Sequence, residues 1–146
     1  MKINSVLVVC VGNICRSPVG AALLARSCPD LRVESAGIGA LEGHGADKTS
    51  AEIAAADGLN LDSHIARQFT AEIASEFDLI LGLEKGHLRV ITSKAPASSG
   101  KTLLFGQWLN QSDIADPYRK SREFHALVFD EISKAAESWA KKLGCI

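Results

Sequence analysis

Short apolar runs alternate along the chain with longer stretches whose apolar residues recur at helical spacing. A continuous apolar run is typical of a strand covered on both faces of a sheet, and residues 6–11 form one. Residues 31–35, 78–83 and 102–105 predict three further strands. The intervening and final stretches predict helices over residues 17–27, 47–58, 70–75, 84–92 and 124–143. Residues 96–100 predict a turn.

The order of these elements predicts an α/β fold. Strands that alternate with helices form a parallel sheet, and the connecting helices cover both of its faces. We therefore expect a single-domain three-layer sandwich over residues 1–146, built on a four-stranded parallel sheet. In such sheets, ligands bind at the carboxyl ends of the strands, so the residues after the first strand are the first place to look for a site.

Composition and charge narrow the class of protein. A net charge of -1 argues against a general nucleic-acid binder. No apolar run approaches the roughly 20 residues that a transmembrane helix needs. The apolar stretch near the N-terminus lacks the small-residue cleavage site of a signal peptide and runs directly into a loop. We expect a cytoplasmic protein without membrane insertion.

The four cysteines contain no C-x-x-C pair, so we expect no structural zinc site. Structural disulfides are rare in cytosolic proteins of this size, and we expect none here. Cys28 and Cys145 are predicted to be free, either as small buried hydrophobes or as exposed thiols.

The residues after the first strand read C-V-G-N-I-C-R-S, from Cys10 to Ser17. A loop between a strand and a helix can turn its backbone N–H groups onto an anion, and the helix N-terminus adds the positive end of its dipole. Arg16 carries a planar guanidinium that matches phosphate oxygens. Cys10 would lie under the phosphorus as a thiolate. The pattern predicts a phosphate site with its own nucleophile, as in a cysteine-dependent phosphatase.

Further residues of this loop support the prediction. Gly12 and Asn13 tolerate the positive φ values that turn N–H groups inward. Ser17 is expected to cap the following helix, with Pro18 at the first helical position. The Ser17 hydroxyl can also donate to the sulfur of Cys10. An ordinary turn with a buried cysteine would explain the strand, but it leaves the adjacent arginine unexplained.

A proton donor for the leaving group is expected at Asp116, within the segment D-I-A-D-P-Y-R-K that starts at Asp113. Expelling an alkoxide or phenolate is easier when an acid protonates its oxygen. Pro117 restricts Asp116 to extended conformations and so holds its carboxyl on the loop after the fourth strand. Asp113 is the alternative acid, without such a restraint, and an Asp-Pro pair can also be a plain turn.

With these segments combined, the chain resembles the low-molecular-weight protein tyrosine phosphatases. The matching segments are C-V-G-N-I-C-R-S-P from Cys10, S-A-G from Ser35, H-I-A-R-Q from His64, D-L-I-L from Asp78 and D-P-Y from Asp116. They are spread over most of the chain. The cysteine loop combined with a distant D-P-Y is highly specific, whereas S-A-G alone would mean nothing.

The resemblance implies a role for each matching residue. Cys10 matches the nucleophile that forms a phosphocysteine intermediate, and Arg16 matches the arginine that stabilises the transition state. Asp116 matches the general acid of the first step and the general base of the second. The mechanism that the resemblance implies uses no cofactor and no metal. Tyr118 resembles the aromatic wall beside the substrate ring.

The resemblance also implies a set of supporting and substrate-binding residues. Asn13 resembles the residue that holds the loop in shape through Ser35 and His64, and Ser17 resembles the residue that assists the thiolate. Cys15 matches a second loop cysteine that can form a reversible disulfide with the nucleophile. The implied substrate-binding residues are Val11, Gly12, Asn13, Ile14, Cys15, Ser17, Leu41 and Tyr118.

Several stretches look closer to the bacterial subgroup of this family, which includes partners of tyrosine autokinases in capsule and exopolysaccharide export. These stretches are Ala40-Leu41, Phe105-Gly106-Gln107-Trp108-Leu109 and the D-P-Y-R-K-S segment from Asp116. The resemblance therefore implies a phosphotyrosine protein as partner, expected to be such an autokinase. Two departures, Ala21 and the Leu83-Glu84 pair, are not expected to touch the chemistry. The charged run Arg119-Lys120-x-Arg122 could attract an acidic tail or could be a solvated turn.

Two other functions remain to be weighed. A thiol-linked arsenate reductase of the same fold needs further cysteines after the third strand, and residues 82–90 contain none. A non-catalytic flavodoxin-like module could hold a phosphate or a cofactor on the same loop. The presence of both Cys10 and Asp116 argues against that alternative.

Overall fold

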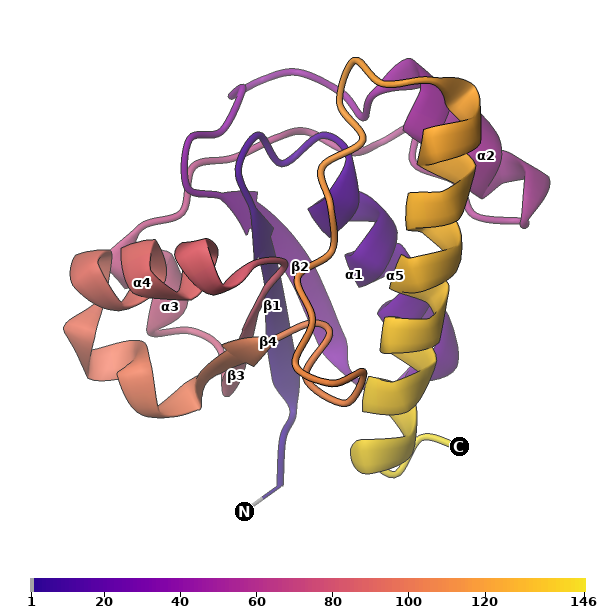
Figure 1. Ribbon diagram of the computed structural model, residues 1–146. Coiled ribbons are helices and arrows are strands. Elements are labelled where there is room, and N and C mark those ends of the chain that lie inside the picture. The colour runs from indigo at the N-terminus through magenta and orange to yellow at the C-terminus, as the bar shows by residue number, and fades with distance from the viewer. Residues whose placement is uncertain (1) are drawn as a thin grey trace.

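Four parallel strands form the centre of the molecule, with helices on both faces (Figure 1). The computed structural model describes residues 2–146. The strands are β1 (Ser5–Cys10), β2 (Arg32–Gly37), β3 (Leu79–Gly82) and β4 (Thr102–Leu104), and their spatial order is β2-β1-β3-β4. The predicted fold class and all four predicted strands are confirmed.

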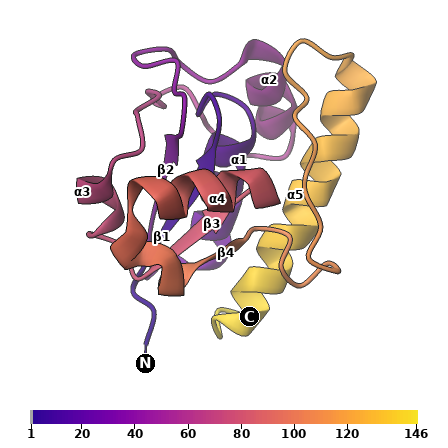
Figure 2. The same ribbon diagram turned by 60° about the vertical axis from the view of Figure 1, so that its left-hand side comes forward.

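The helices divide between the two faces of the sheet, as the turned view makes clear (Figure 2). One face carries α1 (Arg16–Ser27), α2 (Lys48–Ala56) and α5 (Arg122–Lys142). The other carries α3 (Ala71–Ala74) and α4 (Lys85–Lys94), followed by the 3₁₀ helix η1 (Pro96–Lys101). Each α-helix corresponds to a predicted one, and the predicted turn at 96–100 is the 3₁₀ helix.

Strand β1 shows why the chain folds into layers. Its side chains alternate between the faces: Val6, Val8 and Cys10 lie in the core under α1 and α5, whereas Leu7 and Val9 lie in the core under α4. Residues 6–9 are completely buried, which is why all four of them are apolar. The register places Cys10 opposite Gly37 at the carboxyl end of the strand.

Helix α1 begins earlier than the sequence predicted. Its first residue is Arg16 and its N-cap is Cys15, so the expectation of Ser17 as the cap was wrong. Pro18 is the third helical residue, where its missing N–H is one of four that no helix can satisfy internally. The shift frees the Ser17 hydroxyl for another contact, described below.

A disulfide joins Cys28 to Cys145, so the prediction of two free thiols was wrong. Cys28 ends α1, and Cys145 follows the end of α5. The two helices pack against each other on the same face of the sheet and bring the two Cα atoms to 5.3 Å. Because 117 residues separate the cysteines, only the tertiary packing reveals the pair. Among residues 2–146, no helix is long and apolar enough to cross a membrane.

Candidate active site

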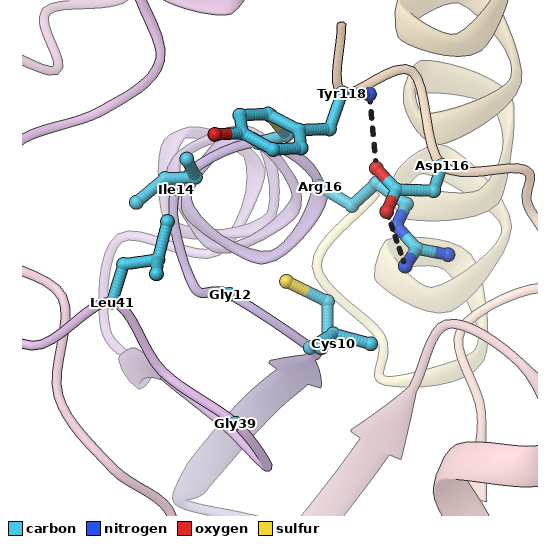
Figure 3. Close-up of a pocket in the computed structure, with 10 residues that line it drawn as sticks. Cys10, Gly12, Ile14, Arg16, Gly39, Leu41, Asp116 and Tyr118 are labelled. Atoms are coloured by element: carbon cyan, nitrogen blue, oxygen red, sulfur yellow. Dashed lines mark hydrogen bonds and ion pairs between the residues drawn. The ribbon is translucent and has the colours of Figure 1, made fainter.

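Cys10 lies on the floor of a pocket at the carboxyl end of β1 (Figure 3). The pocket has a volume of about 180 Å³. It is lined by Cys10, Val11, Gly12, Ile14, Cys15, Arg16, Gly39, Leu41, Asp116 and Tyr118. The Cys10 sulfur points into this space and lies 3.0 Å from the hydroxyl oxygen of Ser17, which is the contact expected from the sequence.

Asn13 holds the loop in its curved shape. Its backbone is in the left-handed region, with a φ of 59°, and its side chain is completely buried. The side-chain amide donates to the hydroxyls of Ser17, at 2.8 Å, and Ser35, at 2.9 Å. Its oxygen accepts from the backbone N–H of Arg67, and its own carbonyl lies 2.6 Å from Nε2 of His64. The structure therefore brings together the four residues that the sequence grouped as a supporting network.

The two glycines near this loop differ from expectation. Gly12 is not among the residues with positive φ, so the left-handed turn falls on Asn13 alone. Gly37, at the end of β2, is needed for a different reason: a side chain there would collide with the carbonyl oxygen of Val11. The end of the S-A-G segment thus packs directly against the backbone of the Cys10 loop, which requires a glycine there. The short motif alone did not predict this contact.

Arg16 is 1% exposed and is held by contacts on one side of its guanidinium. Its Nη1 donates to a carboxylate oxygen of Glu84 and to the carbonyl of Ile114, at 2.7 Å. Its Nη2 lies 3.7 Å from Asp116 Oδ2. Because Nη1 is occupied, the Nε and Nη2 donors remain for an anion in the pocket. This geometry suits a flat, two-pronged contact with phosphate oxygens.

Glu84 contacts the predicted site directly, so the expectation that it stands apart was wrong. It precedes α4 and reaches Arg16 from the neighbouring strand end. Nε2 of the buried His87 lies 3.6 Å from the same carboxylate oxygen. Burial, followed by the positive charge of Arg16, lowers the pKa of His87 and keeps it neutral, so Arg16 is the charged partner of Glu84. Because 68 residues separate Arg16 from Glu84, the sequence does not indicate that they form a pair.

Asp116 enters the pocket from the loop before α5 (Figure 3). Its Oδ1 accepts the backbone N–H of Tyr118 at 3.0 Å, while its side chain remains 47% exposed. Asp113 is turned elsewhere and accepts the backbone N–H of Lys85 at 2.8 Å. Of the two predicted acids, Asp116 is therefore the one that lines the pocket.

The pocket rim is apolar and partly exposed. Val11, Leu41 and Tyr118 are 42%, 37% and 37% exposed, and all three face the opening. Figure 3 shows Leu41 and Ile14 on one side of Cys10 and the ring of Tyr118 above it. An aryl ring entering between them would bury apolar area on both of its sides.

Cys15, like Cys10, is a free and buried cysteine. Burial is the main cause that raises the pKa of the Cys15 thiol to about 12, and the negative charge of Asp47 adds to it. Cys15 therefore stays protonated at neutral pH. Residues 2–146 contain no group of three His, Cys, Asp or Glu side chains placed to share a metal ion.

Comparison with known proteins assigns this arrangement to a family. A profile described as low molecular weight phosphotyrosine protein phosphatase matches residues 5–145. The chain belongs to this family. Two relatives from Escherichia coli K12 are the low molecular weight protein-tyrosine-phosphatases Etp and Wzb. Etp is 49% identical over 143 residues, covering 98% of this chain and 97% of Etp. Wzb is 50% identical over 140 residues, covering 96% of this chain and 95% of Wzb.

Solved structures agree with this assignment. Wzb of Vibrio vulnificus in complex with benzylphosphonate is 46% identical with a TM-score of 0.96, covering 97% of this chain and 100% of that one. Wzb of Escherichia coli K30 in complex with sulphate is 45% identical with a TM-score of 0.96, covering 98% and 100%. The predicted family and enzyme class are confirmed, and the chain is a protein-tyrosine-phosphatase.

Proposed function

We propose that this phosphatase hydrolyses phosphotyrosine through a phosphocysteine intermediate on Cys10. One observation carries the proposal: the Cys10 sulfur lies on the floor of a pocket to which Arg16 and Asp116 also contribute. A nucleophile, an anion-binding guanidinium and an acid are the three groups that the reaction needs. Residues 1–146 act in this proposal as one phosphatase domain.

In the first step, the Cys10 thiolate attacks phosphorus and the bond to the tyrosine oxygen breaks. The Ser17 hydroxyl, 3.0 Å from the sulfur, donates to the thiolate. The Nε and Nη2 groups of Arg16 bind the phosphoryl oxygens as charge moves onto them. Protonated Asp116 gives its proton to the departing phenolate oxygen, so the tyrosine leaves neutral.

In the second step, water hydrolyses the phosphocysteine. Asp116 is now a carboxylate and accepts a proton from the attacking water, which restores the acid for the next cycle. Sulfur leaves as the thiolate and inorganic phosphate is released. The same carboxyl thus serves both steps, which fits its partial exposure at the pocket mouth.

We infer that the physiological substrate is a tyrosine autokinase that controls polysaccharide export, and that the reaction takes place in the cytoplasm. The bacterial-subgroup segments of the sequence support this inference, as does about half-identity to Etp and Wzb. The arsenate-reductase alternative receives no support, because residues 82–90 offer no relay cysteine and Cys28 is bonded to Cys145.

A substrate trap tests the proposal. Cys10→Ser keeps the anion-binding loop but lacks the nucleophile, so it should retain tyrosine-phosphorylated protein from a lysate of the source organism, and free phenyl phosphate should elute it. Cys15→Ser is the matched control on the same loop and should retain none. Recovery of phosphotyrosine on a kinase supports the inference, while recovery of another class of protein rejects the autokinase. Equal kcat/KM for phosphotyrosine and phosphoserine peptides in the wild type rejects tyrosine selectivity.

A further inference from the structure

A positively charged side chain that the reaction itself does not use packs on Tyr118, one of the residues that line the pocket. The Arg119 guanidinium lies over the ring of Tyr118, with its carbon 5.1 Å from the ring centroid. A guanidinium above an aromatic face is attracted by the ring and is restrained against it. Tyr118 lines the pocket, so this contact places the charge next to a residue of the pocket rim.

The backbone of Arg119 is unusual for a residue of its size. The N–H of Lys120 donates to the carbonyl of Pro117 at 2.9 Å and closes a tight turn. Arg119 is the third residue of that turn and has a φ of 61°, in the left-handed region. Glycine adopts this conformation freely, whereas an L side chain is strained in it. The turn therefore carries a long charged side chain at a position where its backbone conformation favours glycine.

The neighbouring charges are placed differently. Arg122 lies at the start of α5 and forms an ion pair with Glu52 at 3.0 Å. Lys120 is exposed and forms neither an ion pair nor an aromatic contact within the described part of the chain. Over residues 2–146, Arg119 likewise has no carboxylate partner. Within residues 119–122, Arg119 alone both packs on a residue of the pocket and lacks a carboxylate partner.

We propose that Arg119 determines substrate specificity by binding a carboxylate side chain adjacent to the phosphotyrosine. This proposal rests on the proposed function and deepens it, because it names the substrate class as phosphotyrosine flanked by Asp or Glu. In this proposal Tyr118 contacts the substrate ring and also restrains the guanidinium of Arg119. The sites for the phosphotyrosine ring and for the flanking carboxylate are therefore adjacent. The planar guanidinium of arginine can donate two parallel hydrogen bonds to a carboxylate, which the ammonium group of lysine cannot do.

The test compares two phosphotyrosine peptides of equal length, one with Glu on both sides of the phosphotyrosine and one with Gln there. An exposed ion pair predicts that wild-type kcat/KM favours the Glu peptide by roughly 2- to 5-fold at low salt. The preference should shrink as ionic strength rises, because salt screens exposed charges. Single-Glu peptides then show on which side the carboxylate is bound.

Variants of the turn assign that preference to one residue. Arg119→Gly removes the side chain and suits the left-handed backbone, so it should fold and abolish the preference. Arg119→Gln is a second neutral variant that retains part of the stacking surface and should do the same. Arg119→Lys keeps the charge without the planar stack, and should retain less than half of the preference. Lys120→Gln and Arg122→Gln are the matched controls and should keep it.

The outcomes separate this proposal from the one that it rests on. A wild type that hydrolyses both peptides equally, or an Arg119→Gly variant that keeps the preference, overturns the role of Arg119 while leaving the phosphatase assignment intact. Equal loss in Lys120→Gln also overturns it, because a diffuse positive surface would then be sufficient. A wild type that hydrolyses neither peptide overturns the proposed function itself.

Discussion

The two sides of the site are constructed in opposite ways. The loop that carries Cys10 is held through the buried Asn13, which forms hydrogen bonds with Ser17, Ser35 and residues 64–67. The segment that carries Asp116 is largely exposed, and that carboxyl has one hydrogen bond, to the N–H of Tyr118. The contrast indicates that the anion and the nucleophile need fixed positions, whereas the acid needs access to both a leaving group and water.

The largest expected effect comes from the nucleophile. Cys10→Ser replaces a thiolate with a neutral hydroxyl, and should lower kcat on the order of 10⁶-fold, as nucleophile loss does in other covalent mechanisms. Phosphate binding should persist, because Arg16 and the loop N–H groups remain. Steady-state turnover and phosphate titration measure the two effects. Turnover within 100-fold of wild type would remove Cys10 from the mechanism.

Asp116→Asn tests the exposed side. Loss of a general acid is typically worth about 10²–10⁴-fold, and should appear most strongly with poor leaving groups. We expect a large loss on phenyl phosphate and a smaller one on p-nitrophenyl phosphate. The measurement is kcat/KM for each of the two substrates in the variant and in the wild type.

Asp113→Asn is the matched control for the acid, since its carboxyl contacts the Lys85 N–H instead of the pocket. It should change kcat by less than about 3-fold on both substrates. If Asp116→Asn and the wild type depend equally on leaving-group pKa, another residue is the acid.

Asn13→Ala tests the buried side. It removes three side-chain hydrogen bonds, one buried and two partly buried, and places alanine in the left-handed region. We expect a loss of about 3 kcal/mol in the free energy of unfolding, and about 10²-fold in kcat from a displaced loop. Denaturant unfolding and phosphotyrosine turnover measure the two losses.

Asn13→Gly separates hydrogen bonding from backbone strain. It loses the same bonds but tolerates the left-handed backbone, so it should be about 1 kcal/mol more stable than Asn13→Ala. Equal stabilities would mean that the backbone conformation contributes nothing to the cost.

Glu84→Gln gives the smallest effect and tests whether the buried guanidinium needs its charged partner. The amide keeps the size of the side chain but not its charge, and Arg16 retains its bond to the Ile114 carbonyl. We expect kcat/KM to fall about 10-fold, equivalent to about 1.4 kcal/mol, with weaker binding of inorganic phosphate. Glu52→Gln breaks an exposed pair and should change neither quantity. Unchanged phosphate affinity in Glu84→Gln would show that Glu84 does not position Arg16.

The sequence predicted most of what is local or periodic. The alternation of apolar runs and helical stretches identified the parallel sheet, because burial on both faces favours apolar residues such as those at 6–9 of β1. The spacing between Cys10 and Arg16 predicted the loop, and the preference of asparagine for positive φ predicted its turn. The N-cap of α1 was misplaced, because Ser17 suits an N-cap as well as a contact with sulfur.

Contacts between distant segments were the part that the sequence could not predict. Glu84 carries no signal of its own, since an isolated acid before a helix is usually a solvated residue. The disulfide between Cys28 and Cys145 could not be predicted, because the two cysteines come together only when α1 packs against α5. Gly37 belongs to the short S-A-G segment, which carries little information by itself. A glycine is needed there because the carbonyl oxygen of Val11, in the loop after β1, lies too close to leave room for a side chain.

The buried network around Asn13 also has a consequence for the order of folding. Its partners lie 4, 22, 51 and 54 residues away along the chain. The nascent loop cannot take its working shape until β2 has paired with β1 and residues 64–67 have docked against both. Such non-local contacts form late, because closing long stretches of chain is entropically unfavourable. Enzymatic activity in a refolding sample should therefore return after the circular dichroism signal of the helices has recovered, so turnover reports the last stage of assembly.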